Sequence, residues 1–200
     1  MRQLLALLFC LSLVPNVWAG ASLDFDEDGD CIDVGSAVEP TSGDGTYTAW
    51  LNGDDVAADF SRAMSGFNGT GNEGYLISKR SGANQEDIAC LVSMNSTFRV
   101  AGPSSTSFDD GVWHFVVCDF TDGVSASVNL FVDDMTTAQA TTSGNFGSFQ
   151  GGPNNLFIGA RGPCTTNEWD GRIAHVQIFM DKVLTAAERE QIKHWPGSIA

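Results

Sequence analysis

Apolar and polar residues alternate in short runs along most of this chain. The runs are rich in β-branched and aromatic residues, and clusters of Gly, Asn, Asp and Ser separate them. Alternation with a period of two, bounded by turn residues, predicts half-buried β-strands. The predicted strands cover residues 46–51, 74–79, 88–94, 97–101, 113–120, 128–132, 155–160 and 173–179. A series of this kind is typical of an all-β sandwich or barrel. We predict that residues 136–148 form a polar loop.

One helix is predicted, at the end of the chain. Thr185 is followed three residues later by Glu188, which is the pattern of a capping box. The Thr hydroxyl accepts from the third amide of the helix, and the Glu side chain reaches back to the cap. The following residues favour a helix that stops before Pro196. We therefore predict a short C-terminal helix within residues 185–195.

The first nineteen residues have the composition of a secretory signal peptide. Arg2 precedes a short apolar run, and Ala19 closes a Val-x-Ala pattern. The run is too short to span a bilayer, and no later run is long enough for membrane insertion. A buried N-terminal helix is the alternative. We predict a signal peptide over 1–19 and a single secreted, extracellular domain over 20–200.

The formal net charge is −15, from ten Lys and Arg residues against twenty-five Asp and Glu residues. A field of this sign repels phosphate backbones and anionic lipid. Nucleic-acid and membrane-surface partners are therefore not expected.

Four cysteines remain after the predicted cleavage: Cys31, Cys90, Cys118 and Cys164. An even number in a secreted chain favours two disulfides, with three connectivities open. Free buried thiols are the alternative. The cysteines lack the close spacing of zinc and redox motifs.

Residues 24–34, "DFDEDGDCIDV", begin like an EF-hand calcium loop. Such a loop needs a bidentate carboxylate at its twelfth position and a helix on each side. Counted from Asp24, the twelfth residue is Gly35, so the EF-hand interpretation fails. A hairpin that turns through Asp28 and Gly29 fits the alternation better. The alternative is a different calcium site that uses Asp26, Asp28 or Asp30 with backbone carbonyls.

An ordered series of motifs resembles one family, the laminin G-like, concanavalin A-like lectin-glucanase jelly rolls. The series is "LDFDEDGDCIDVG", "YTAWL", "YLISKR", "DDGVWHFVVCDF", "VNLFVDDM", "NNLFIGA" and "WDGRIAHVQIFMDKVLTAAE". It covers about residues 22–192, nearly the whole predicted mature chain. The resemblance implies a two-sheet antiparallel jelly roll. It also implies that Trp113 and Trp169 pack at the end of the sandwich and that His114 is structural.

The last predicted strand departs from the family pattern. It reads Gly-Arg-Ile-Ala-His-Val over residues 171–176, where relatives often carry two carboxylates after the Ile. Any calcium that relatives bind through this strand is therefore in doubt here, and we expect His175 to lie at the surface.

Cys90 and Cys118 lie on the inward faces of strands that border the same central hairpin. We accordingly predict the pairs Cys90–Cys118 and Cys31–Cys164.

The sequence does not indicate an enzyme. Jelly-roll glycan hydrolases place their acids on one strand, and the nearest match, residues 168–172, lacks the third acid. We predict a secreted non-catalytic recognition module that binds carbohydrate or a glycosylated partner. Trp50 faces away from Tyr47 and Leu51 and is the candidate for stacking on a sugar; packing under a covering loop is its alternative. A structural or adhesive protein-interaction domain without a sugar site is the alternative function.

Overall fold

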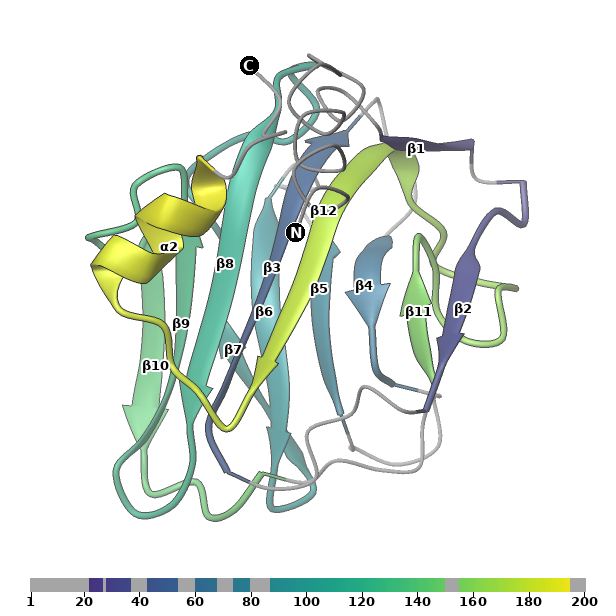
Figure 1. The fold of residues 1–200 in the computed structure, drawn as a ribbon. Helices are drawn as coiled ribbons and strands as arrows, with labels where there is room; N and C mark the ends of the chain where they lie inside the picture. The colour runs from purple at the N-terminus through teal and green to yellow at the C-terminus, as the bar shows by residue number, and fades with distance from the viewer. Residues whose placement is uncertain are drawn as a thin grey trace, which may run out of the picture.

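The computed structural model describes residues 22–26, 28–36, 43–53, 60–67, 74–79, 87–149 and 155–194. These residues form two antiparallel sheets stacked face to face, with one short helix (Figure 1). The all-β jelly-roll prediction is confirmed. The predicted signal peptide lies outside the described residues. Among the helices that are described, none has the length and apolar character to cross a bilayer.

Each sheet contains six strands. Sheet A has the order β1 (Leu23–Asp26), β12 (Asp170–Met180), β3 (Gly45–Gly53), β8 (His114–Thr121), β9 (Ala126–Val132) and β10 (Ala140–Gly144). Sheet B has the order β2 (Ile32–Gly35), β11 (Leu156–Ile158), β4 (Arg62–Ser65), β5 (Tyr75–Lys79), β6 (Ile88–Met94) and β7 (Thr97–Ala101). The main core fills the space between the two sheets.

Strand β3 shows why sheet A is buried on both faces. Tyr47, Ala49 and Leu51 point into the core between the sheets, as the alternation predicts. Trp50 points the other way, into a second apolar cluster with Phe115 on the outer face of the sheet. A strand with both faces covered has little exposed side-chain surface, and every residue of β3 is buried.

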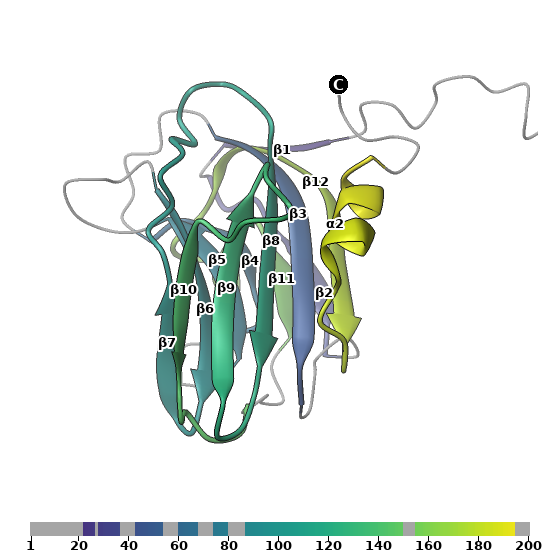
Figure 2. The same ribbon diagram turned by 90° about the vertical axis from the view of Figure 1, so that its left-hand side faces the viewer.

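Helix α2 (Ala186–Lys193) covers part of that outer face (Figure 2). It begins with the predicted capping box at Thr185 and Glu188. Ile192 packs against the Trp50 cluster. The Arg189 guanidinium lies 3.8 Å from the centre of the Phe131 ring and pairs with Asp119 at 2.8 Å. The helix is thus anchored to sheet A by apolar packing and a buried ion pair.

Both disulfides have the predicted pairing. Cys90 of β6 is bonded to Cys118 of β8, which joins the two sheets through the core. Cys31 is bonded to Cys164, which ties the connection between β1 and β2 to the segment after β11.

Two local predictions are wrong. Strands β1 and β2 do not form a hairpin, because β1 pairs with β12 in sheet A and β2 pairs with β11 in sheet B. Gly29 provides a turn at φ 88°, but the chain crosses from one sheet to the other there. The polar segment after residue 136 contains strand β10, which pairs with β9 at the edge of sheet A. Its residues alternate between half-buried and exposed, so few apolar side chains mark it.

Candidate functional site

Trp50 is not accessible as a platform for a ligand in this structure. Only 7% of the residue is exposed, and its ring centre lies 5.2 Å from that of Phe115. Ile192 of helix α2 packs against the same cluster. The arrangement is the alternative stated for Trp50: Trp113, Met135 and Ala138 of the loops before β8 and after β9 pack in or against its cluster, and helix α2 adds Ile192 to the cover.

The acidic stretch forms the exposed crossing between β1 and β2. Asp26, Asp28 and Asp30 are all exposed, and the Asp28 amide donates to Asp26 Oδ1 at 3.1 Å. Among the described residues, which omit Glu27, no group of three or more His, Cys, Asp or Glu side chains is gathered closely enough to hold a metal ion. A calcium site at these three residues stays a prediction.

Two loops at one end of the sandwich form a better candidate site. Residues 102–113 lead into β8, and residues 133–139 follow β9; we call these two segments the loop end. Of the tryptophans in the described part of the chain, Trp113 at this end is half-buried, whereas Trp50 and Trp169 are buried. The Arg172 guanidinium lies 5.4 Å from the centre of the Trp113 ring. Arg172 is itself held by Asn52 Oδ1, at 3.0 Å from Nη2.

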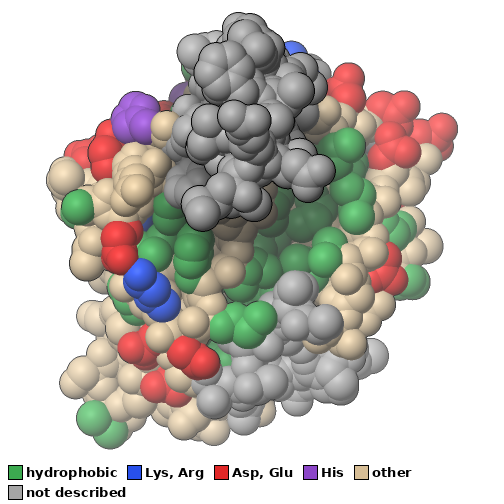
Figure 3. All heavy atoms as spheres, in the orientation of Figure 1, with side chains coloured by type: hydrophobic (Ala, Val, Ile, Leu, Met, Phe, Trp, Pro, Cys, Tyr) green, Lys and Arg blue, Asp and Glu red, His purple; other side chains and the backbone are tan. Residues whose placement is uncertain are grey.

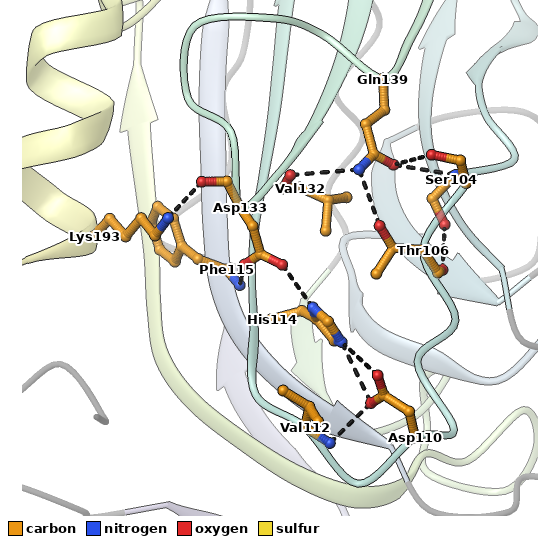
Figure 4. Close-up of polar contacts among 11 residues, drawn as sticks. Ser104, Thr106, Asp110, Val112, His114, Phe115, Val132, Asp133, Gln139 and Lys193 are labelled. Atoms are coloured by element: carbon orange, nitrogen blue, oxygen red, sulfur yellow. Dashed lines mark hydrogen bonds and ion pairs between the residues drawn. The ribbon is translucent and has the colours of Figure 1, made fainter.

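His114 bridges the two loops (Figure 4). Its Nδ1 lies 2.6 Å from Asp133 Oδ2, and its Nε2 lies 3.3 Å from both carboxylate oxygens of Asp110. Asp133 also accepts from the Phe115 amide at 2.9 Å, and Lys193 of helix α2 donates to its carbonyl. One buried imidazole therefore ties both loops to the end of β8, and the structural role expected of His114 agrees with these contacts.

Further contacts tie the two loops to each other and to β3. Gln139 Oε1 accepts from the Ser105 amide at 3.1 Å, and its Nε2 donates to Thr106 Oγ1 at 2.9 Å. The Gly53 amide donates to the Phe108 carbonyl at 3.0 Å, and a Cβ at position 53 would lie 2.4 Å from that oxygen. Glycine is therefore needed where the first loop docks on β3. Side chains on loops held this way lose little entropy when a ligand binds.

The electrostatics of the loop end follow from these contacts. The hydrogen bond to Asp133 is the main cause that raises the pKa of His114. Burial acts to raise the pKa of Asp133, but the hydrogen bonds from His114 and the Phe115 amide outweigh it, so that pKa is lowered. Hydrogen bonds from the Thr136 side chain and amide lower the pKa of Asp134 to about 2. The loop end thus carries the carboxylates of Asp110, Asp133 and Asp134, which accept hydrogen bonds from the loops and from β8, in addition to Trp113 with the Arg172 guanidinium.

Sequence reasoning missed this combination. It assigned Trp113 and Trp169 to packing at the end of the sandwich; Trp169 is completely buried, and Trp113 packs half-buried against the Trp50 cluster. It did not single out Asp110, Asp133 or Arg172. The acids occur in two Asp-Asp pairs, at 109–110 and 133–134, each next to a predicted strand. These Asp-Asp pairs could have indicated the site. The start of one strand and the end of its antiparallel neighbour lie at the same end of a sandwich.

The two stacked sheets and the helix on one outer face define a concanavalin A-like jelly-roll domain. The Laminin_G_3 family model, described as the concanavalin A-like lectin/glucanases superfamily, matches residues 26–188. The chain belongs to this family. No curated protein sequence matches it significantly.

Solved structures share the fold at low sequence identity. The binding domain of Paraclostridial Mosquitocidal Protein 1 is 11% identical with a TM-score of 0.60, over 86% of this chain and 42% of that one. Mouse laminin α1 domains LG4-5 are 9% identical with a TM-score of 0.55, over 80% and 39%. The sialidase CBM40 of Ruminococcus gnavus, bound to α2,3 sialyllactose, is 12% identical with a TM-score of 0.58, over 85% and 94%.

This chain therefore spans less than half of the first two proteins and nearly all of the third. At these identities the likeness establishes the fold. The family and fold support a binding domain of the non-catalytic type.

Proposed function

We propose that the protein is a secreted, non-catalytic recognition module that binds carbohydrate, or the glycan of a glycosylated partner, at the loop end. The observation that carries the proposal is the half-buried Trp113 ring with the Arg172 guanidinium 5.4 Å from its centre, on the same loop as the Asp110 carboxylate, which accepts from the Val112 amide and contacts His114. A sugar ring presents C–H groups that pack on an aromatic face and hydroxyls that bond to charged groups. These three side chains provide both kinds of contact.

Two further observations support a glycan as ligand. One of the structural neighbours is a carbohydrate-binding module bound to α2,3 sialyllactose, and the alignment covers 94% of that module. The acidic surface of this chain disfavours phosphate-rich partners, whereas a neutral sugar is not repelled.

A glycan array tests the proposal. The secreted protein is applied with calcium and again with a chelator, and Asp28→Ala is applied with calcium. We expect selective binding to one class of glycan. If calcium is held by Asp26, Asp28 or Asp30 with backbone carbonyls, the chelator lowers the melting temperature or abolishes that signal, and Asp28→Ala has the same effect; if the chelator leaves both unchanged, the calcium site alone is refuted. An array with no selective signal contradicts the carbohydrate proposal and leaves the protein-interaction alternative.

A further inference from the structure

An apolar groove opens between the two sheets on the side of β12 and β2. Two adjoining hollows, with volumes of about 280 and 240 Å³, share the side chains of Val34, Ile158 and Val176. Figure 3 shows hydrophobic side chains gathered in a hollow on this face. Exposed apolar residues border it: 50% of Leu23, 44% of Val34 and 41% of Met180 are accessible. Contiguous exposed apolar surface with polar residues around it is typical of an interaction site.

The backbone beside the groove is unpaired as well. Strand β12 pairs with β3 along most of its length, but β1 covers its other edge only from Asp170 to Ile173. On the described residues, the stretch from Ala174 to Met180 has no strand on that side. An open strand edge presents amide and carbonyl groups that an extended peptide can pair with.

The predicted signal-peptide cleavage limits how far the chain before β1 could extend along this edge. If β1 were extended toward its N-terminus, each residue before Leu23 would pair with about one further residue of β12 beyond Ile173. The reason is that the two strands pair one residue with one residue. Cleavage after Ala19 would leave three residues before Leu23. With one-to-one pairing the continuation would reach Val176, and one residue further if it followed the irregularity of β12 between Ala174 and Gln177, so the edge from Ile178 to Met180 would stay open.

The charge beside the groove indicates which partner fits. Exposed acids follow the β1–β2 side, at Asp24, Asp30 and Asp33 among others, and none of the described residues that line the two hollows is Lys or Arg. Figure 3 shows acidic side chains gathered next to the hollow. A second copy of this chain carries the same net charge of −15 and would be repelled at short range. A segment with basic flanks would be attracted.

We propose that the groove between β12 and β2 binds an extended peptide segment of a partner protein, apolar at alternate positions and flanked by Lys or Arg, which adds a strand to the open edge of β12. Alternate side chains of the segment fill the two hollows, because successive residues of a strand point to opposite faces. Its basic flanks lie against the acidic residues of the β1–β2 crossing. Within the described chain, no residue that lines the two hollows lies on the loop end, although Arg172 of the proposed glycan site adjoins Ile173 in β12, so the two proposals rest on different residues.

An array of nine-residue peptides tests the proposal. The peptides alternate Val, Ile or Tyr with Thr and carry either two Lys or two Glu residues at each end. We expect binding of the Lys-flanked set, at least tenfold weaker binding of the Glu-flanked set, and slower amide hydrogen exchange at residues 178–180 in the complex. Val34→Lys places a charge in the groove and is expected to lower affinity at least tenfold.

Val124→Lys is the matched control, because Val124 is 79% exposed on the turn between β8 and β9, away from the groove. It should leave affinity unchanged. Three outcomes overturn the proposal: no peptide binds, Val34→Lys binds as tightly as the wild type, or residues 178–180 exchange equally fast with and without peptide. A dimer in sedimentation that Val34→Lys disrupts would also overturn it, because the occupant would then be a second copy.

Discussion

At the residue scale, His114 makes the stability of the loop end depend on pH. Its pKa in the folded protein is raised above 6.5, so its contribution is fully present below about pH 6.5 and is lost as the pH rises through the folded value. The pKa of Asp133 is lowered below 3.8, so its contribution is lost only as the pH falls through that lower value. The bridge is therefore strongest in moderately acidic solution.

We expect His114→Gln to lower the free energy of unfolding by about 2 kcal/mol near pH 5.5 and by less near pH 9, because a hydrogen bond to a charged group is stronger than a neutral one. Chemical denaturation at the two pH values measures the difference. His194→Gln is the control, since His194 and Glu190 form an exposed pair on helix α2. An equal loss at both pH values for His114→Gln would contradict this account of the bridge.

Residue directions within strands could be predicted, but burial by distant segments could not. The alternation correctly placed Tyr47 and Trp50 on opposite faces of β3. Trp50 is lost as a ligand platform because residues far along the chain pack over it, among them Trp113, Met135 and Ile192 of helix α2. Alternation with a period of two predicts the direction in which a side chain points. It carries no information about which residues pack over that side chain.

At the element scale, Arg189 attaches helix α2 to sheet A. Its side chain pairs with Asp119, donates to the Met135 carbonyl at 3.1 Å and lies over the Phe131 ring. Burial raises the pKa of Asp119 even with Arg189 present. We expect Arg189→Ala to lower the free energy of unfolding by about 3–5 kcal/mol, because it leaves Asp119 buried without its ion-pair partner.

Adding Asp119→Asn to Arg189→Ala should recover part of that loss, since the remaining group is neutral and Asn129 can still donate to it. Thermal or urea unfolding of both variants provides the comparison. A loss below about 1 kcal/mol for Arg189→Ala, in the range of exposed ion pairs, would show that the pair does not hold the helix.

The elements themselves were predictable where the local sequence determines them. Strands β6 and β7 match the predicted ranges, and the capping box fixed the start of helix α2. Strand β10 was missed because its stability comes from pairing with β9 rather than from apolar residues. The predicted hairpin at Asp28 and Gly29 failed because the partners of β1 and β2 lie far along the chain.

At the scale of the whole molecule, the disulfide between Cys90 and Cys118 holds the two sheets together. Both cysteines are fully buried in the core. Replacing both with Ala should lower the free energy of unfolding by about 2–5 kcal/mol, because the unfolded chain regains the freedom that the bond removes. Non-reducing mass analysis should find both disulfides; four alkylatable thiols in the native protein would contradict the pairing.

The central claim is that the loop end around Trp113 binds a glycan. Its most direct test is the affinity of the best glycan from the array, measured by calorimetry for the wild type, Trp113→Ala and Val124→Ala. Removing an aromatic contact at the centre of a binding site typically costs about 2 kcal/mol, so we expect Trp113→Ala to weaken binding at least tenfold. Val124→Ala, at the opposite end of β8, should bind as the wild type does. Unchanged affinity in a folded Trp113→Ala variant would contradict the claim.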